Sequence, residues 1–469
     1  MSDWNEYAVI PDRPPSLDKK GFRRAIIPAP VKGNWRKFRD YFYYILICIF
    51  LLTPWLNYNG KQLLKLDLST RQFTVLGQTF FAYNAPSIFI FFITFVFSIA
   101  YITYKYGRIW CGMACPQTVF IDKIFRKIDK FVEGNYLQRR KNDQAPLSFN
   151  KVLKRIMRWT LYIVFSSFIA HTFTAYFAGA KELLYITMES PAHNWSLFLW
   201  VQFLTAIFTF NFGWFREQFC LIACPYGRFQ SVLMGKKTST VVYDFKRGEP
   251  RKSKGVKTTE VGGDCINCLR CINVCPTGID IRNGNQMECI GCTSCIDACD
   301  EIMQKVKKPK GLIRFSSEEE IESQNFKRIS FLPIAFLLII FTLILSGISY
   351  FTLNRPIAHI KVLRAIDTPY RVVQENGRDY ILNHFKAHIT AQSSSDIIIE
   401  KIELAGNYEI IAPYLPLKIK SSKDKWVHFF IKTEKRSIQE NKKKLNINFN
   451  VVMKQNYLIY PKEVIFLSP

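Results

Sequence analysis

The sequence predicts a multi-domain membrane protein, in which a five-helix transmembrane bundle carries a cysteine-rich insert and a C-terminal all-β domain. Three observations predict this class. Five apolar runs approach or reach the roughly 20 residues that span a bilayer. Twelve of the 13 cysteines fall into four tight groups. The last part of the chain lacks cysteine and consists of short apolar runs separated by turn residues.

The apolar runs define the predicted helical part. They cover residues 41–56, 85–104, about 156–177, 197–215 and 329–352. The first run is slightly short, which flanking aromatic residues or local thinning of the bilayer can accommodate. The predicted parts are a basic arm (1–40), transmembrane helices 1–4 as two hairpins (41–234), an insert (255–315), a fifth helix (329–352) and an external domain (355–469).

Positive charge sets the predicted orientation. The arm and the loop from 105 to 155 are rich in Lys and Arg, whereas the loop from 179 to 196 carries only Lys181. The positive-inside rule therefore places the N-terminus and the insert in the cytoplasm and the C-terminal domain in the periplasm. The same loops explain the net charge of +27, so the basic balance indicates a lipid bilayer and no nucleic acid. The expected location is the inner (cytoplasmic) membrane, multi-pass, without a cleavable signal peptide.

The insert contains the most specific motif. Residues 265–276 read CINCLRCINVCP, and the cysteine spacing C-x2-C-x2-C-x3-C returns from Cys289 to Cys299. Bacterial two-cluster ferredoxins bind two [4Fe–4S] clusters with such runs, and the fourth cysteine of each run crosses to the other cluster. Zinc sites usually space their cysteines in separated pairs, which makes zinc the weaker interpretation. One predicted ligand set is Cys265, Cys268, Cys271 and Cys299. The other is Cys275, Cys289, Cys292 and Cys295.

An internal repeat carries the other four clustered cysteines. GRIWCGMACPQTVFIDKI follows the second apolar run, and REQFCLIACPYGRFQSVL follows the fourth. Both contain Cys-x3-Cys-Pro just beyond an apolar run, so the first four helices form two similar hairpins. We call Cys111, Cys115, Cys220 and Cys224 the membrane-edge set. Its expected role is catalytic and metal-binding, with Cu(I), zinc or a further iron–sulfur cluster as candidate occupants, and buried packing residues are the alternative.

The C-terminal domain is predicted to be β-rich. NHFKAHITAQ, IIIEKIEL, KWVHFFIKT and KLNINFNVVMK are short runs of β-branched and aromatic residues that partly alternate with polar ones. Several short strands at this spacing indicate a small sandwich.

The order of these parts resembles that of the cytochrome c oxidase accessory proteins of the CcoG/FixG/RdxA type, which are membrane-bound polyferredoxins. The resemblance covers nearly the whole chain. It is most specific in the two stretches of the repeat, in CINVCPTGIDIRNGNQMECIGCTSCIDACDEIM and in KPKGLIRFSS. It implies an immunoglobulin-like sandwich for residues 355–469. It also implies reduction of Cu(II) to Cu(I), in support of copper delivery and assembly of a cbb-type cytochrome c oxidase.

We therefore expect a membrane iron–sulfur electron-transfer protein with two [4Fe–4S] clusters and with copper as a further candidate metal, acting as a cupric reductase. The expected partners are copper ions, the cbb-type oxidase or its assembly factors, and an unknown cytoplasmic electron donor. Two rivals remain open: a subunit that exchanges electrons with the quinone pool, and a non-enzymatic scaffold for oxidase assembly. Reoxidation of the reduced clusters by copper, by quinone or by neither separates the three.

Overall fold

The computed structural model describes residues 25–58, 60–68, 70, 72–81, 85–251, 262–325, 332–353, 356–366, 368–375, 377–392, 396–404, 406–420, 423–437, 441–453 and 456–469. Parts of all five predicted regions lie outside the described residues: 1–24 of the arm, 59, 69, 71 and 82–84 of the two hairpins, 255–261 of the insert, 329–331 of the fifth helix, and 355, 367, 376, 393–395, 405, 421–422, 438–440 and 454–455 of the external domain. The chain divides into two compact units. One comprises Met1–Tyr58, Gln62–Thr74 and Phe81–Ile339, and the other Asn59–Lys61, Val75–Phe80 and Ile340–Pro469.

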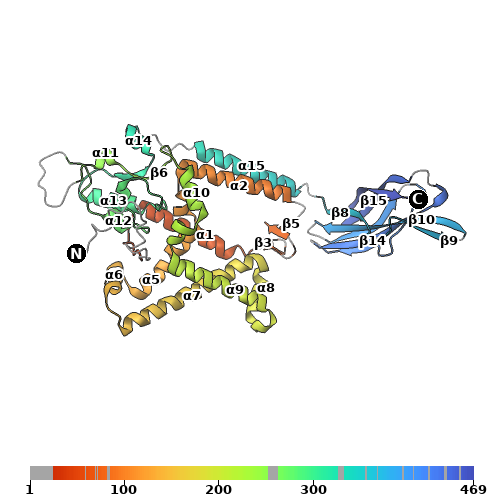
Figure 1. The fold of residues 1–469 in the computed structure, drawn as a ribbon, viewed down its shortest axis with the longest axis horizontal. Helices are drawn as coiled ribbons and strands as arrows, with labels where there is room; N and C mark the ends of the chain where they lie inside the picture. Colours follow the sequence, from red (N-terminus) through yellow and green to blue (C-terminus); the bar gives the residue numbers. More distant parts are fainter. Residues whose placement is uncertain are drawn as a thin grey trace. The chain divides into compact units, whose positions relative to one another are not determined.

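Each of the five predicted spans is helical (Figure 1). The corresponding elements are α1 (Asn34–Leu52), α2 (Ala85–Tyr106), α7 (Phe149–Ala178), α9 (Trp195–Phe208) with its π-helical continuation η5 (Thr209–Phe215), and α15 (Leu332–Leu353). Among the described residues, Phe149–Ala178 and Trp195–Phe215 have the length and apolar composition to cross a membrane. A transmembrane bundle of all five helices stays a prediction.

Short elements connect these helices. After α1 come β1 (Asn57–Tyr58), β2 (Lys61–Gln62), β3 (Leu64–Asp67), β4 (Gln72–Val75) and β5 (Gln78–Phe81). After α2 come α3 (Ile109–Met113), α4 (Pro116–Phe120), η3 (Ile121–Phe125), α5 (Arg126–Glu133) and α6 (Tyr136–Gln144). Between α7 and α9 lie α8 (Ala180–Met188) and η4 (Pro191–His193), and η6 (Phe219–Ala223) and α10 (Pro225–Leu233) follow η5. The strands between α1 and α2 were not predicted.

The insert lies in a small α/β body of the first unit that runs from residue 240 to 323 and is therefore longer at both ends than the predicted 255–315. Its strands β6 (Thr240–Tyr243) and β7 (Ile313–Ser316) pair antiparallel. Its helical segments are α11 (Phe245–Gly248), α12 (Arg270–Asn273), η7 (Ile281–Asn283), α13 (Ser294–Lys305) and α14 (Glu318–Ser323). Six of the insert's eight cysteines pack with buried apolar residues such as Ile272, Ile296 and Leu312 in one core.

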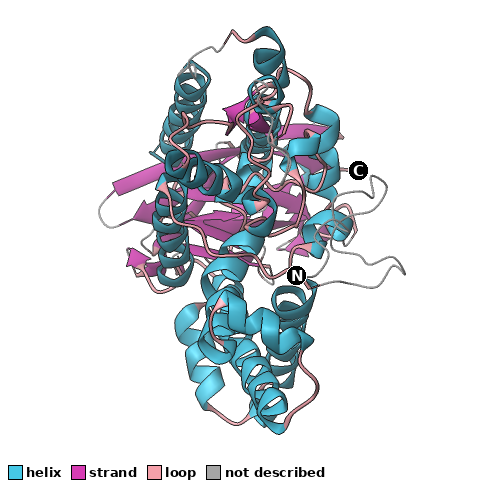
Figure 2. Ribbon diagram, turned by 90° about the vertical axis from the view of Figure 1, so that its left-hand side faces the viewer, coloured by secondary structure: helices cyan, strands magenta, loops and turns pink. Residues whose placement is uncertain are grey.

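The second unit is a two-sheet β domain, whose strands are magenta in Figure 2. One sheet has the order β12–β14–β10–β8 with β9 also paired to β10, and the other has the order β13–β11–β15–β16. The strands are β8 (Ala358–Arg364), β9 (Arg371–Glu375), β10 (Arg378–Ala391), β11 (Ile397–Leu404), β12 (Glu409–Ile411), β13 (Leu417–Ile419), β14 (Asp424–Glu434), β15 (Lys442–Met453) and β16 (Asn456–Leu467), with η8 (Lys435–Ser437) after β14. Phe429 of one sheet meets Phe449 of the other with ring centroids 6.0 Å apart. The predicted β-rich domain is confirmed, and its kinship with immunoglobulin domains stays a prediction.

Candidate metal centres

The first insert set gathers around one cavity. This cavity is lined by Cys265, Cys268, Cys271 and Cys299. Cys271 lies on α12 and Cys299 on α13, so the two short helices bring together the third cysteine of the first run and the last cysteine of the second. Apolar side chains, including Met303 and Ile313, close much of the remaining wall.

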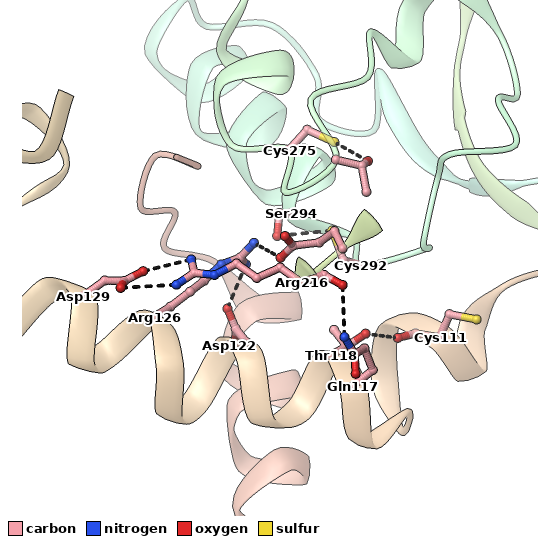
Figure 3. Close-up of polar contacts among 12 residues, drawn as sticks. Cys111, Gln117, Thr118, Asp122, Arg126, Asp129, Arg216, Cys275, Cys292 and Ser294 are labelled. Carbon is pink, nitrogen blue, oxygen red and sulfur yellow. Dashed lines mark hydrogen bonds and ion pairs between the residues drawn. The ribbon is translucent and has the colours of Figure 1, made fainter. Parts of the chain in front are cut away.

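The second insert set gathers around another cavity. This cavity is lined by Cys275, Cys289, Cys292 and Cys295, with Cys271 also on its wall. Hydroxyl groups accompany two of the sulfurs (Figure 3): Thr277 Oγ1 lies 3.3 Å from Cys275 Sγ, and Cys292 Sγ donates to Ser294 Oγ at 3.6 Å. The two cavities group the eight cysteines as the crossed assignment requires. Their ligation of iron stays a prediction.

The two cysteine runs of the insert share a backbone feature: residues with positive φ flank one cysteine in each run. Asn267 and Leu269 flank Cys268 with φ of 55° and 57°, and Gly291 and Thr293 flank Cys292 with φ of 66° and 59°. Left-handed residues turn the chain sharply and direct successive N–H groups into one concavity, which is a binding site for anions. Such turns let closely spaced cysteines face a common centre that their thiolates make negative.

Burial disfavours the thiolate form of these cysteines and so raises the pKa of their thiols. It raises the pKa of Cys299 to about 12, and the neighbouring thiols of Cys268 and Cys265 add to the effect. Burial likewise raises the pKa of Cys289 to about 12, with further contributions from Cys275 and Cys292. Thiolates that are buried and repel one another need positive charge between them. The sulfur-only donor sets therefore fit iron–sulfur clusters.

The structure also brings the membrane-edge set together. Burial raises the pKa of Cys111 to about 12, and the nearby thiols of Cys115 and Cys224 act in the same direction. Burial also raises the pKa of Cys220, as do Cys115 and Cys111. Cys115 and Cys224 are the N-caps of α4 and α10, so the proline after each cysteine is the first helical residue. The four thiols, two from each hairpin, are neighbours.

Polar contacts join the two copies of the repeat next to these cysteines (Figure 3). The amides of Gln117 and Asn211 pair with each other at 3.0 and 2.8 Å, and Gln117 also donates to the carbonyl oxygen of Arg216 at 3.0 Å. The Cys111 thiol donates to Oε1 of Gln230, a fully buried residue of α10, at 3.3 Å. The first hairpin therefore holds its cysteines against the second.

The insert touches the membrane-edge set backbone to backbone. Gly112 lies between Cys111 and Cys115, and a Cβ at this position would collide with the carbonyl group of Gly291 and lie 2.9 Å from the Cys292 nitrogen. A Cβ at Gly291 would in turn lie 2.8 Å from the carbonyl oxygen of Arg108. The loop of the second insert set therefore packs directly on the segment that carries the first pair of membrane-edge cysteines.

Two arginines hold this contact. Arg108 donates to the carbonyl oxygens of Met287, of Cys289 at 3.4 Å and of Gly227 at 2.9 Å, which links the cluster loop to α10. Arg39 of α1 donates to the carbonyl oxygen of Cys292 and to Ser294 Oγ at 3.2 Å. Both side chains also place positive charge beside a site that thiolates make negative.

A cavity of about 650 Å³ adjoins the membrane-edge set and the second insert set, because its wall includes Cys220 and Cys292. Seven basic side chains line it: Arg36, Arg39, Arg126, Lys127, Lys130, Arg139 and Arg270. The acidic side chains of its wall are Asp122 and Glu217. Such a wall attracts anionic ligands and repels a free divalent cation.

A buried ion pair braces the hairpins near this cavity (Figure 3). The Asp129 side chain is fully buried and accepts from Arg216 and Arg139, each at 2.9 Å, and from the Tyr162 hydroxyl. Burial alone would raise the pKa of Asp129, but Arg216 and Arg139 lower it to about 2. The carboxylate therefore ties α5, α6 and α7 to the turn after η5.

Sequence reasoning missed these supporting residues. The Gly112–Gly291 contact and the two arginines join segments far apart in the chain, which no local spacing reveals. A glycine inside each of the stretches CGMAC and CIGC was the only available signal. Among the described residues, no three His, Cys, Asp or Glu side chains lie close enough to hold a single metal ion.

Known proteins resemble this chain in the same regions. A family model described as a 4Fe-4S dicluster domain matches residues 215–318, and one described as a 4Fe-4S binding domain matches residues 85–133. Protein RdxA of Cereibacter sphaeroides is 36% identical over 310 residues, which is 64% of each chain. Protein RdxB of the same organism is 36% identical over 62% of each chain.

A third relative and one solved structure are similar in part. Nitrogen fixation protein FixG of Rhizobium meliloti is 34% identical over 63% of this chain and 57% of its own. The alignments thus span less than two thirds of these relatives. The crystal structure of a FixG-related protein from Vibrio parahaemolyticus matches 24% of this chain and 97% of its own, at 11% identity and a TM-score of 0.20, which supports no argument about the fold.

The matched regions contain all twelve clustered cysteines and both family models describe iron–sulfur binding. Over these regions the chain matches iron–sulfur proteins of the FixG/RdxA type.

Proposed function

We propose that this chain conducts electrons from a cytoplasmic donor through two [4Fe–4S] clusters in the insert to the membrane-edge set, where Cu(II) is reduced to Cu(I). When bound, such clusters release one electron at a time, and each Cu(II) ion accepts one. The observation that carries the proposal is the backbone contact between Gly112 and the Gly291–Cys292 loop. It supports a short route from the second insert set to the membrane-edge cysteines.

The chain's own residues favour copper chemistry at this place. Soft sulfur groups stabilise Cu(I) over Cu(II), so thiol-rich surroundings favour the reduced product. The basic cavity beside Cys220 favours copper that arrives in an anionic complex over the free divalent ion. Support of cbb-type oxidase assembly, with the oxidase or its assembly factors as partners, is proposed from the family resemblance. A multi-pass inner-membrane location with a periplasmic C-terminal domain is proposed from the loop charges.

Reoxidation of the reduced clusters tests this function. The protein is purified without oxygen, reduced, freed of reductant and mixed with Cu(II) in the presence of a Cu(I)-specific chelator. We expect the visible absorbance of the oxidised clusters to return as the Cu(I)–chelator complex forms, at about one Cu(I) per electron lost. Reoxidation by a quinone and not by copper would favour the quinone-linked subunit. Clusters that neither oxidant reoxidises would favour the scaffold.

The crossed ligand assignment makes a separate prediction. Cys275→Ala should remove about four irons, because it destroys the cluster shared with Cys289, Cys292 and Cys295. Adding Cys292→Ala should remove no further iron, whereas adding Cys268→Ala should remove about four more. Iron and sulfide analysis checks both pairs, with Cys48→Ala as the control, since Cys48 is exposed and belongs to none of the three sets. An uncrossed assignment gives the reverse result for the two double variants.

A further inference from the structure

We propose that the membrane-edge set binds a third [4Fe–4S] cluster, with one ligand each from Cys111, Cys115, Cys220 and Cys224. The inference rests on the proposed electron-transfer function and deepens it by naming the occupant of the site from which electrons leave for copper. Copper then takes its electron at the cluster and is not itself held by the four thiolates.

The number and placement of the thiols favour a cluster. The two copies of the repeat that carry the four cysteines are in direct contact: the Cys111 thiol donates to Oε1 of Gln230 at 3.3 Å, and the amides of Gln117 and Asn211 pair at 3.0 and 2.8 Å. Four thiols are the number that a cubane cluster takes, and each of the two insert sets has the same number.

The family model adds an independent observation. Residues 85–133 match a 4Fe-4S binding domain, yet this stretch contains only Cys111 and Cys115. A cubane cluster takes four thiolates, so a cluster in this region needs two ligands from elsewhere. The second copy of the repeat brings Cys220 and Cys224 to the same place. The two copies together complete one ligand set.

The surroundings suit a buried anionic cluster. Four thiolates around one Cu(I) ion leave a net charge of about −3, whereas around an oxidised [4Fe–4S] core, sulfides included, they leave about −2. The Arg108 guanidinium lies near Cys111 and favours its thiolate. The buried Gln230 amide accepts from the Cys111 thiol at 3.3 Å. Once Cys111 is a thiolate, a turn of this amide lets its N–H donate to sulfur, as cluster sulfurs in proteins commonly require.

Iron content decides the proposal. We expect about twelve irons and twelve sulfides per full-length chain isolated without oxygen, as three cubanes require, and about eight after all four membrane-edge cysteines are changed to Ser. Mössbauer and EPR spectra should assign the lost iron to one [4Fe–4S] cluster, with the two insert clusters unchanged. Cys48→Ser serves as the matched control.

The outcomes separate this proposal from copper reduction. About eight irons in the unaltered chain, or one copper or zinc ion that disappears in the quadruple variant, would overturn the third cluster. Should the quadruple variant fail to fold, the single variant Cys220→Ser must still change the spectrum of one cluster only, and an unchanged spectrum counts against the proposal. If the protein contains about twelve irons but copper does not reoxidise its clusters, the third cluster is supported and the proposed cupric reductase function is rejected.

Discussion

Asp129→Ala is expected to destabilise the helical unit by about 3–5 kcal/mol, the cost of leaving a buried charge without its partner. Asp129 is fully buried, and its carboxylate is held by Arg216 and Arg139, each at 2.9 Å. Its removal leaves the largely buried Arg216 without this carboxylate, whereas Arg139 keeps its ion pair with Glu133 at 3.3 Å. The midpoint of thermal unfolding in detergent, followed by tryptophan fluorescence, measures the loss.

The pH dependence has a defined sign. The folded-state pKa of Asp129 is lowered to about 2 from an ordinary value of 3.8, so its stabilisation is complete above pH 4 and lost as the pH falls toward 2. Asp143→Ala is the matched control, because Asp143 is an exposed carboxylate on the neighbouring α6. Its effect should stay within about 0.5 kcal/mol. Equal midpoints for the two variants would show that the ion pair does not brace the hairpins.

Gly112→Val is expected to uncouple the insert from the membrane-edge set. The new side chain would meet the Gly291 carbonyl and the Cys292 nitrogen, which are backbone atoms that cannot rotate away. Overpacking of this kind costs about 1–3 kcal/mol, which lowers the equilibrium constant for docking of the insert by a factor of about 5 to 150. Reoxidation of the insert clusters by Cu(II) should therefore slow by up to about a hundredfold, while both clusters keep full occupancy.

Rapid mixing of reduced protein with Cu(II) measures the rate, and EPR spectra verify the clusters. Gly235→Ala is the control, because a Cβ at Gly235 meets no atom within 4 Å. A Gly112→Val protein that transfers electrons at the unaltered rate would place the exit of electrons away from this contact.

Helical segments were predictable because apolar runs mark the length of a membrane span. Their ends were not. The first helix was predicted from residue 41 but begins at Asn34, since its polar first turns pack on the insert, where Arg36 N–H donates to Asp297 at 2.7 Å. The third helix begins at Phe149 and not near 156, for its early turns are also polar. Hydropathy detects what lipid can cover and misses polar turns, which the insert covers at the start of α1 and which are mostly exposed at the start of α7.

The cysteine groups followed from spacing, because the chemistry of a cluster fixes how many thiols must reach it and from which run. Spacing could not reveal Gly112, Arg39 or Arg108. Their roles depend on which loop docks on which hairpin, and that is decided by shape and charge across long sequence separations. The membrane-edge set was only partly predictable: the repeat identified its four cysteines, but only the folded structure shows that they are neighbours.

The membrane-edge set is divided between two hairpins, and this division determines when during synthesis its metal centre can be loaded. Cys111 and Cys115 leave the ribosome about a hundred residues before Cys220 and Cys224. The first hairpin alone thus offers two thiols, which cannot retain a metal centre that needs four. If the proposed cluster forms there, its loading waits until the second hairpin has folded against the first, and a filled site then reports correct pairing of the two hairpins.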